Sequence, residues 1–183
     1  MAELTYRDAV ARGIAQEMTR DPDPVIFFEH KSLYATKGEV PDGEIVDTLG
    51  SARILRPGKD ATILALALMV PRALGAAEKL KAQHSIDCEV IDVRSLVPLD
   101  TQTILGSVAK THRLFTVEEN PRLCGWGAEI VSIAVDEGFY DHDGPPVRIT
   151  TPHIPLPAAD NLEDIVLPTP ARIAETVRRS LNS

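Results

Sequence analysis

The sequence predicts an α/β fold in which a mostly parallel sheet is covered by helices on both faces. From Asp60 onward, apolar runs of strand length alternate with longer segments whose apolar residues recur every three or four positions. The apolar runs lack the alternation of a half-exposed strand, so we expect them to be buried on both faces. Helices placed between such strands favour parallel pairing through crossover connections.

Each element of this region has its own signals. Pro71 favours the first turn of a helix, Asp100 is a candidate N-cap for the next one, and Thr169-Pro170 caps and opens the last. The expected strands are 62–67, 88–93, 114–117 and 147–150; the expected helices are 70–83, 101–110, 127–136 and a last one containing Ile173, Val177 and Leu181.

The first 59 residues are less regular. Residues 1–22 are predicted to form an N-terminal helix, which ends where Pro22 and Pro24 forbid its continuation. Residues 23–59 hold one apolar run, Val25–Phe28, followed by a polar stretch rich in glycine and proline that is typical of a linker. A short edge strand is expected at 44–46. The sequence thus predicts a boundary near Asp60, with residues 60–183 forming the α/β domain.

Composition restricts the partners of the chain. The 183 residues contain 19 Lys and Arg against 27 Asp and Glu, a formal net charge of −8. Such a charge repels nucleic acid and anionic membranes and favours a basic partner. No apolar run has the ~20 residues that a membrane span needs, and the first residues do not read as a signal peptide. A soluble, cytoplasmic protein with reduced cysteines is expected.

Three motifs follow the ends of predicted strands, where functional groups collect in an open α/β sheet. Arg94 could hold a carboxylate or phosphate, or could pair with a neighbouring acid. Glu118 and Glu119 could divide acid and base roles, but neighbours on a strand point to opposite faces, so we expect instead that one of them caps the next helix or contacts a subunit. Trp126, between two glycines at a helix start, fits an anion site, close packing or an interface anchor. Arg94, Glu118 and Trp126 are therefore candidates for an anion or interface site.

Two further patterns concern histidines and acids. None of the five histidines has metal-ligand spacing or follows a nucleophile motif, and His153 is the one worth testing. Asp141 and Asp143 lie in an acidic cluster on an exposed loop, which is either a solvated face or a docking patch for a basic partner. The residues predict no catalytic constellation and no metal site.

Several segments together resemble the β subunit of the thiamine-diphosphate-dependent E1 component of 2-oxo acid dehydrogenase complexes, of the pyruvate, branched-chain and acetoin types. The similar segments are Thr5–Pro22, Pro24–Gly43, Ala73–Leu80 (ALGAAEKL), Glu89–Asp100 (EVIDVRSLVPLD), Val117–Asn120 (VEEN), Gly125–Ile130 (GWGAEI) and Arg148–Pro157 (RITTPHIPLP). This resemblance implies the family's C-terminal, transketolase-C-like domain, a three-layer αβα sandwich with a mostly parallel five-stranded sheet.

The resemblance also implies a shortened chain. In the family a whole pyrimidine-binding domain separates the segments that here meet at Pro22 and Asp23. That domain carries the glutamate and the histidine that act on thiamine diphosphate, and no residue here matches either. The family uses thiamine diphosphate and Mg²⁺, which this chain alone is not expected to bind. Family members use the C-terminal domain for β–β homodimer contacts and for docking the subunit-binding domain of the E2 acyltransferase, alongside an E1 α subunit.

The sequence leaves three hypotheses open. The first is an E1β-like assembly and docking chain without its own turnover, with Asp141 and Asp143 facing E2. The second is a free-standing small-anion-binding or regulatory α/β domain that uses Arg94 and the helix entrance at Trp126. The third is an inactive product of deletion or of misannotated gene boundaries, with no selected function. Because the sheet that covers Val25–Phe28 in the family is not encoded here, the residues before Tyr34 are expected to pack on another copy of the chain or to be poorly ordered.

Overall fold

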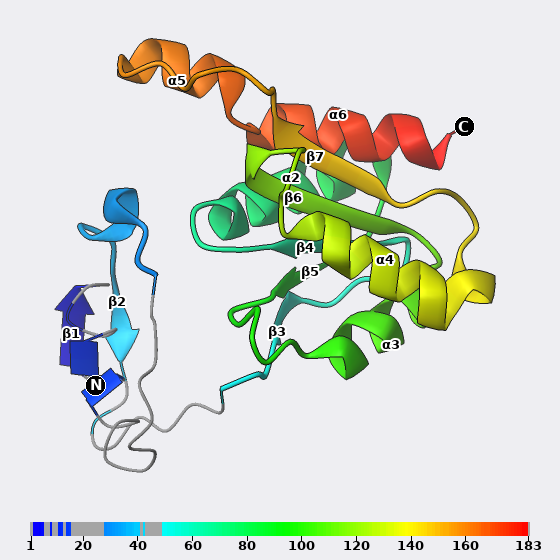
Figure 1. Cartoon of the computed structure of the whole chain (residues 1–183), viewed down its shortest axis with the longest axis horizontal. Coiled ribbons are helices and arrows are strands. Elements are labelled where there is room, and N and C mark those ends of the chain that lie inside the picture. Colours follow the sequence, from blue (N-terminus) through cyan, green and yellow to red (C-terminus); the bar gives the residue numbers. More distant parts are fainter. Residues whose placement is uncertain are drawn as a thin grey trace. The chain divides into compact units, whose positions relative to one another are not determined.

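The structure is a computed structural model that describes residues 2–5, 8, 11–12, 14–15, 28–40, 42 and 49–182. The chain divides into two units, residues 1–49 and residues 50–183, and each is described by itself. The second unit contains nearly all of the described secondary structure (Figure 1).

A five-stranded sheet forms the centre of the second unit. Its strands lie in the order β3-β5-β4-β6-β7, and only β3 runs antiparallel to its neighbour. The strands are β3 (Arg53–Arg56), β4 (Ala61–Ala65), β5 (Cys88–Asp92), β6 (Leu114–Pro121) and β7 (Val147–Thr151). The predicted mostly parallel, five-stranded sheet is confirmed.

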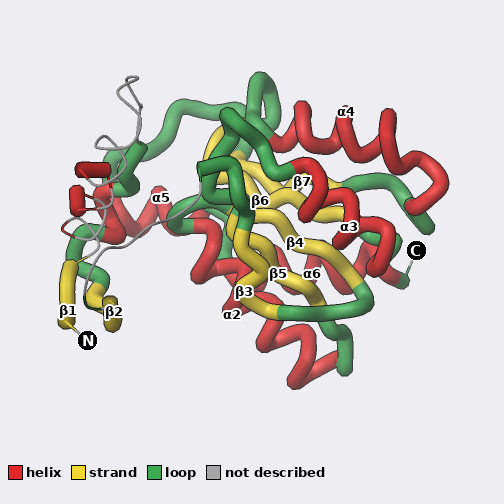
Figure 2. Tube along the Cα trace, turned by 90° about the horizontal axis from the view of Figure 1, so that it is seen from below, coloured by secondary structure: helices red, strands yellow, loops and turns green. Residues whose placement is uncertain are grey.

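Helices cover both faces of this sheet, which gives three layers (Figure 2). Helices α2 (Met69–His84) and α6 (Pro170–Leu181) pack on one face, and α3 (Thr101–Thr111) and α4 (Gly127–Gly138) pack on the other. Successive side chains of β4 point to opposite faces of the sheet, so this strand contributes to both hydrophobic cores: Ile63 belongs to the α2/α6 core and Leu64 to the α3/α4 core.

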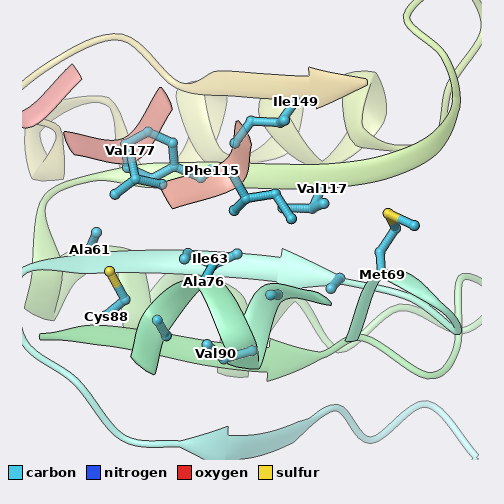
Figure 3. Close-up of a cluster of buried hydrophobic side chains, with 14 of the residues drawn as sticks. Ala61, Ile63, Met69, Ala76, Cys88, Val90, Phe115, Val117, Ile149 and Val177 are labelled. Atoms are coloured by element: carbon cyan, nitrogen blue, oxygen red, sulfur yellow. The ribbon is translucent and has the colours of Figure 1, made fainter. Parts of the chain in front are cut away.

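The hydrophobic core contains the apolar residues of the predicted strands. All five residues of β4 are buried, and Phe115 of β6 packs with Ile63, Val90 and Val177 on the α2/α6 face (Figure 3). Burying one such large apolar side chain contributes about 1.5–3 kcal/mol to folding. The doubly covered sheet thus explains why the apolar residues of these strands do not alternate with polar ones.

The predicted helix caps are confirmed. The Asp100 carboxylate accepts a hydrogen bond from the backbone N–H of Thr103 at 3.0 Å, and it also accepts from the Ala52 N–H at 2.9 Å. Thr169 Oγ1 accepts from the Arg172 N–H at 3.2 Å, and proline follows Thr169 at the helix start. Each cap satisfies an N–H that the first helical turn leaves without an intrahelical partner.

Two elements of this unit were not predicted. Strand β3 lies in the stretch interpreted as linker, so the α/β unit begins at Gly50 rather than at Asp60. Helix α5 (Asp160–Val166) follows β7 and projects from the domain (Figure 1). The Arg172 guanidinium fixes its end by donating to the carbonyl of Val166 at 3.1 Å, and Arg72 donates to the carbonyl of Pro168 at 3.1 Å.

The first unit also differs from the predicted helix over 1–22. Residues Ala2–Thr5 form β1, which pairs antiparallel with β2 (Lys37–Val40), and helical residues are described at 8, 11–12 and 14–15. A 3₁₀ turn, η1, spans Lys31–Leu33. Phe28 is 89% exposed, whereas the rest of its apolar run and the expected strand at 44–46 lie outside the described residues.

Candidate functional site

A buried ion pair lies at the carboxyl end of the sheet. Glu118 of β6 is 0% exposed, and each of its carboxylate oxygens accepts a hydrogen bond at 2.8 Å from the guanidinium of Arg148 on β7. Because β6 and β7 are parallel neighbours, residues 30 positions apart reach each other with bidentate geometry. The candidate Glu118 therefore has a fixed cationic partner inside the chain.

Three more donors complete the bonding of this carboxylate. Glu118 accepts from Thr116 Oγ1 at 2.9 Å, from Asn120 Nδ2 at 3.1 Å and from the backbone N–H of Gly127 at 3.1 Å. Burial by itself would raise the pKa of Glu118, but these donors and Arg148 outweigh it and hold the pKa below its usual range. Glu118 is thus an ionised, fully bonded structural carboxylate.

The same ion pair explains the glycines on both sides of Trp126. A Cβ atom at Gly125 would lie closer than 3.0 Å to Glu118 and Arg148, and one at Gly127 would lie closer than 3.0 Å to Glu118 and Thr116. Real Cβ contacts do not reach such distances, so both positions need glycine for packing. The Gly-Trp-Gly pattern is therefore required by the buried carboxylate behind it.

This arrangement bears on the predicted anion site at the start of α4. Trp126 is the N-cap residue of α4 and packs, half-buried, against the α3/α4 core. The N–H of Gly127, which an external anion would use, already donates to Glu118. The structure therefore brings Glu118 and Trp126 together, but with an internal carboxylate in the place of a ligand.

Arg94 lies elsewhere along the same edge of the sheet. It follows β5, and β4 separates β5 from β6, which carries Glu118. Arg94 is exposed and has a positive φ of 61°, and its backbone N–H donates to the carboxylate of Asp92. Burial raises the pKa of Asp92 to about 6, although this N–H and the charge of Arg53 act in the opposite direction.

A second region, at the opposite end of α4, contains the acidic candidates Asp141 and Asp143. A surface groove of about 460 Å³ lies there, lined by Val135, Phe139, Tyr140, His142, Asp143, Gly144, Pro145 and Pro146. We call it the aromatic groove. A 3₁₀ turn, η2 (Phe139–Asp141), follows α4 directly and leads the chain into it. Asp143 is exposed and Asp141 is half-buried.

Hydrogen bonds from α3 hold the acidic loop in place. His112 ends α3 in the left-handed conformation, and its carbonyl accepts from the Asp143 N–H at 2.9 Å. His112 Nδ1 lies 2.9 Å from the carbonyl oxygen of Asp141, and His142 Nε2 lies 3.3 Å from that of Ala134. These contacts use backbone atoms, so the Asp143 carboxylate remains at the surface.

The described side chains do not fit a magnesium site, the metal that the family uses with its cofactor. Among the residues that the structure describes, no three His, Cys, Asp or Glu side chains gather as possible metal ligands. The buried carboxylate at the sheet edge, Glu118, is already bonded to Arg148. Within the same described residues, no helix is long and apolar enough to cross a membrane.

The sequence matches a known family model, described as the C-terminal domain of transketolase, over residues 50–173. This chain belongs to the transketolase C-terminal domain family. The match begins where the second unit begins, at Gly50. The transketolase C-terminal domain of this chain therefore contains β3, the strand that was interpreted as linker from the sequence.

Curated relatives of this transketolase-family chain are E1-type β subunits. It is 40% identical over 170 residues to the β subunit of acetoin:2,6-dichlorophenolindophenol oxidoreductase from Cupriavidus necator, covering 93% of this chain and 50% of the relative. It is 45% identical over 179 residues to the mitochondrial pyruvate dehydrogenase E1 component subunit beta-1 of Arabidopsis thaliana, covering 96% and 48%. The chain thus spans about half the length of these relatives, and the resemblance to E1 β subunits is confirmed.

A solved structure shares the fold. The chain superposes on one titled "Split gene transketolase, inactive beta4 tetramer" with a TM-score of 0.65 and 27% identity, covering 79% of this chain and 46% of that one.

Sequence reasoning missed two features of these sites. The first is the pairing of Arg148 with Glu118. A buried glutamate requires a cation or several hydrogen-bond donors, so an arginine on a later strand is a signal for such a partner. The aromatic pair Phe139-Tyr140 was also missed. Its signal is two adjacent aromatics beside acids at a helix end.

Proposed function

We propose that this chain is an assembly and docking domain of the E1β type for a 2-oxo acid dehydrogenase complex, without turnover of its own. The observation that carries the proposal is its identity of 40–45% with acetoin and pyruvate dehydrogenase β subunits over most of its length. These relatives are named as subunits or components of larger enzymes, which supports a role in assembly.

The partner at the aromatic groove is, in this proposal, the subunit-binding domain of the E2 acyltransferase. Asp143 presents an exposed carboxylate there, and Asp141 lies two residues before it. A net charge of −8 attracts a basic partner over distances near the Debye length, about 8–10 Å at ordinary salt. Docking is therefore expected to weaken as the salt concentration rises.

Homodimerisation through the β-type chain is the second part of the proposal. The split-gene transketolase structure, which shares 27% identity, is titled as an inactive assembly of four β chains. Exposed apolar side chains support self-association here: Phe28 is 89% exposed in the first unit, and Ile165 of α5 is 74% exposed in the second. Contact with an E1 α subunit would use other surfaces of the same domain.

The proposal assigns no catalytic residue. Glu118 has the pKa of an ionised structural carboxylate, because Arg148 and three other donors surround it. The family's thiamine diphosphate and Mg²⁺ are proposed to bind only where a pyrimidine-binding domain is supplied by another chain. The acyl substrate is that of the complex into which the chain assembles.

Two measurements test this function. The purified chain, with thiamine diphosphate, Mg²⁺ and pyruvate, with and without a candidate α subunit, is expected to release no CO₂ above a no-protein control; decarboxylation at ordinary enzyme rates would overturn the proposal. Calorimetric titration with an acyltransferase subunit-binding domain is expected to show binding that weakens with salt. Asp143→Asn should weaken it about fivefold or more, and absence of binding by the wild type would refute the docking role.

A further inference from the structure

A second buried carboxylate lies near the amino end of the sheet, against α3, and takes no part in the proposed docking. Glu89 of β5 is 1% exposed. Its Oε1 accepts a hydrogen bond from the Ser107 hydroxyl at 2.6 Å. Its Oε2 accepts from the Nζ of Lys110 and from the backbone N–H of Gly58, the latter at 3.4 Å. Because this carboxylate is removed from water, these partners determine its chemistry.

The neighbouring residues fix the direction of the Glu89 carboxylate. Thr62 is the β4 partner of Glu89 in the parallel register, and its Oγ1 lies 2.6 Å from Ser107 Oγ and 2.7 Å from Thr111 Oγ1. All three hydroxyl residues are buried. A Cβ atom at Gly58 would lie 2.2 Å from the backbone nitrogen of Glu89, so the loop before β4 also packs closely at this position. The carboxylate is therefore held with one oxygen toward the α3 lysine.

The lysine of this pair, unlike the carboxylate, is open to solvent. Lys110 lies in the last turn of α3, and its side chain is 47% exposed. Lys81 of α2 provides a comparison, because it is 52% exposed and lies 3.4 Å from Asp87, whose side chain is 25% exposed. The two lysines are thus almost equally accessible, but the carboxylate beside Lys110 is buried and the one beside Lys81 is not.

The burial of its partner affects the reactivity of Lys110. Water strongly favours an ammonium–carboxylate pair, but removing the carboxylate from water brings the neutral pair, amine and carboxylic acid, closer to it in free energy. The neutral amine is the nucleophilic form. A nucleophile is activated by a base within hydrogen-bond reach that a third group orients, and Lys110, Glu89 and Ser107 occupy these three positions.

We infer that Lys110 is an acylation site, which takes a small acyl group from an acyl phosphate or an acyl thioester and so removes the cation that Glu89 needs. Glu89 takes the proton that the ammonium group loses. The Nζ atom then bonds to the acyl carbon, the bond from that carbon to phosphate oxygen or to sulfur breaks, and phosphate or thiol leaves with the electron pair and the second proton. Glu89 afterwards stays protonated or carries a buried charge, so acylation destabilises the fold.

Labelling rates test the site in the unaltered protein. The full chain is incubated with acetyl phosphate and, separately, with an acetyl thioester, and mass spectrometry after proteolysis follows acetylation at each lysine. Lys110 should react at least about fivefold faster than Lys81. A rate advantage with only one donor would identify that donor class as the source and support the site. Equal rates, or slower reaction of Lys110 because its ammonium form is protected, would overturn the inference.

Substitutions then test the base. Glu89→Gln keeps the shape of the side chain but cannot take the proton, so the labelling rate at Lys110 should fall to that at Lys81. The matched control is Asp87→Asn, which removes the exposed carboxylate beside Lys81 and should change the rate at Lys81 by less than about twofold. Circular dichroism verifies the folding of both variants. An unchanged rate at Lys110 in Glu89→Gln would overturn the inference.

Thermal unfolding tests the effect of acylation on stability. Lys110→Gln imitates the loss of charge and should lower the melting temperature by about 5 °C or more, because Glu89 is left without its cation. Lys81→Gln is the control and should stay within about 2 °C of wild type. Adding Glu89→Gln to Lys110→Gln should restore part of the loss. Wild-type stability of Lys110→Gln would overturn the inference, and none of these results depends on the docking role.

Discussion

Arg148 and Glu118 meet with both guanidinium–carboxylate contacts at 2.8 Å, and the Glu118 side chain is wholly removed from solvent. Breaking such a pair strongly destabilises the fold, because removing one partner leaves an uncompensated charge in a region of low dielectric constant. The pair joins β6 to β7 and also fixes the start of α4 through Gly127. Several properties of the domain depend on it.

Arg148→Met is expected to lower the free energy of unfolding by about 3–5 kcal/mol, because Glu118 stays buried without its cation. The double variant Arg148→Met with Glu118→Gln should recover part of this loss, since the buried charge is then removed. Urea unfolding measures the free energy of unfolding of the single and the double variant. Arg179→Met, which breaks a pair at the surface where the arginine is 76% exposed, is the control and should leave stability unchanged. Equal stability of the single and double variants would contradict the buried-charge explanation.

Gly127→Ala should destabilise the domain by about 1–3 kcal/mol, because its Cβ would overlap Glu118 and Thr116. Gly106→Ala is the matched control: Gly106 is also helical, and a Cβ there meets nothing within 4 Å. This control should gain about 0.5–1 kcal/mol from the higher helix propensity of alanine. Thermal unfolding compares the two, and a similar effect of both substitutions would refute the close-packing argument.

Asp92→Asn should stabilise the protein more at pH 8 than at pH 5. Burial favours the protonated form and raises the pKa of Asp92 to about 6, so its favourable contribution is complete at low pH and is lost as the pH rises through 6. At pH 8 the wild type therefore carries a buried charge that asparagine lacks, and the penalty for this charge should be on the order of 1–2 kcal/mol larger at pH 8 than at pH 5. Urea titrations at both pH values measure the difference; a gain independent of pH would contradict the assignment.

The two cysteines should differ sharply in reactivity. Cys88 is 0% exposed and burial raises its pKa to about 12, whereas Cys124 is exposed. Because the thiolate is the reactive form, Ellman's reagent at pH 8 should label one thiol in the folded protein and two in urea. Cys124→Ser should abolish labelling of the folded state. Unchanged labelling of that variant would mean that the core around Cys88 opens readily.

The central sheet could be predicted because each of its buried strands has a recognisable apolar pattern in its own few residues. The runs around Ile63, Val90 and Phe115 have no polar alternation, and a sheet covered on both faces requires that composition. The helix caps at Asp100 and Thr169 could also be predicted from the sequence, since a cap depends only on residues within one helical turn.

The unpredicted elements depend on distant partners instead. Arg53–Arg56 is mostly exposed, and it is a strand because its backbone pairs with β5, which no local pattern indicates. Helix α5 has only seven residues, and its end is fixed by Arg72 and Arg172 from two other helices. Likewise, the sequence predicted that Glu118 or Glu119 caps the next helix or contacts a subunit, and Glu118 does accept a hydrogen bond from the N–H of Gly127, the first residue of α4. The ion pair was not predicted, because Arg148 lies on another strand.

The antiparallel strand β3 forms one border of the sheet and limits how another copy could add to that border. Its register shifts between Ile54 and Arg56, and charged side chains stand at both of its ends. A kinked, positively charged border is a poor template for adding another strand, so it prevents ribbon-like polymerisation on that side. On that side of the sheet, association is therefore expected to use helices and loops.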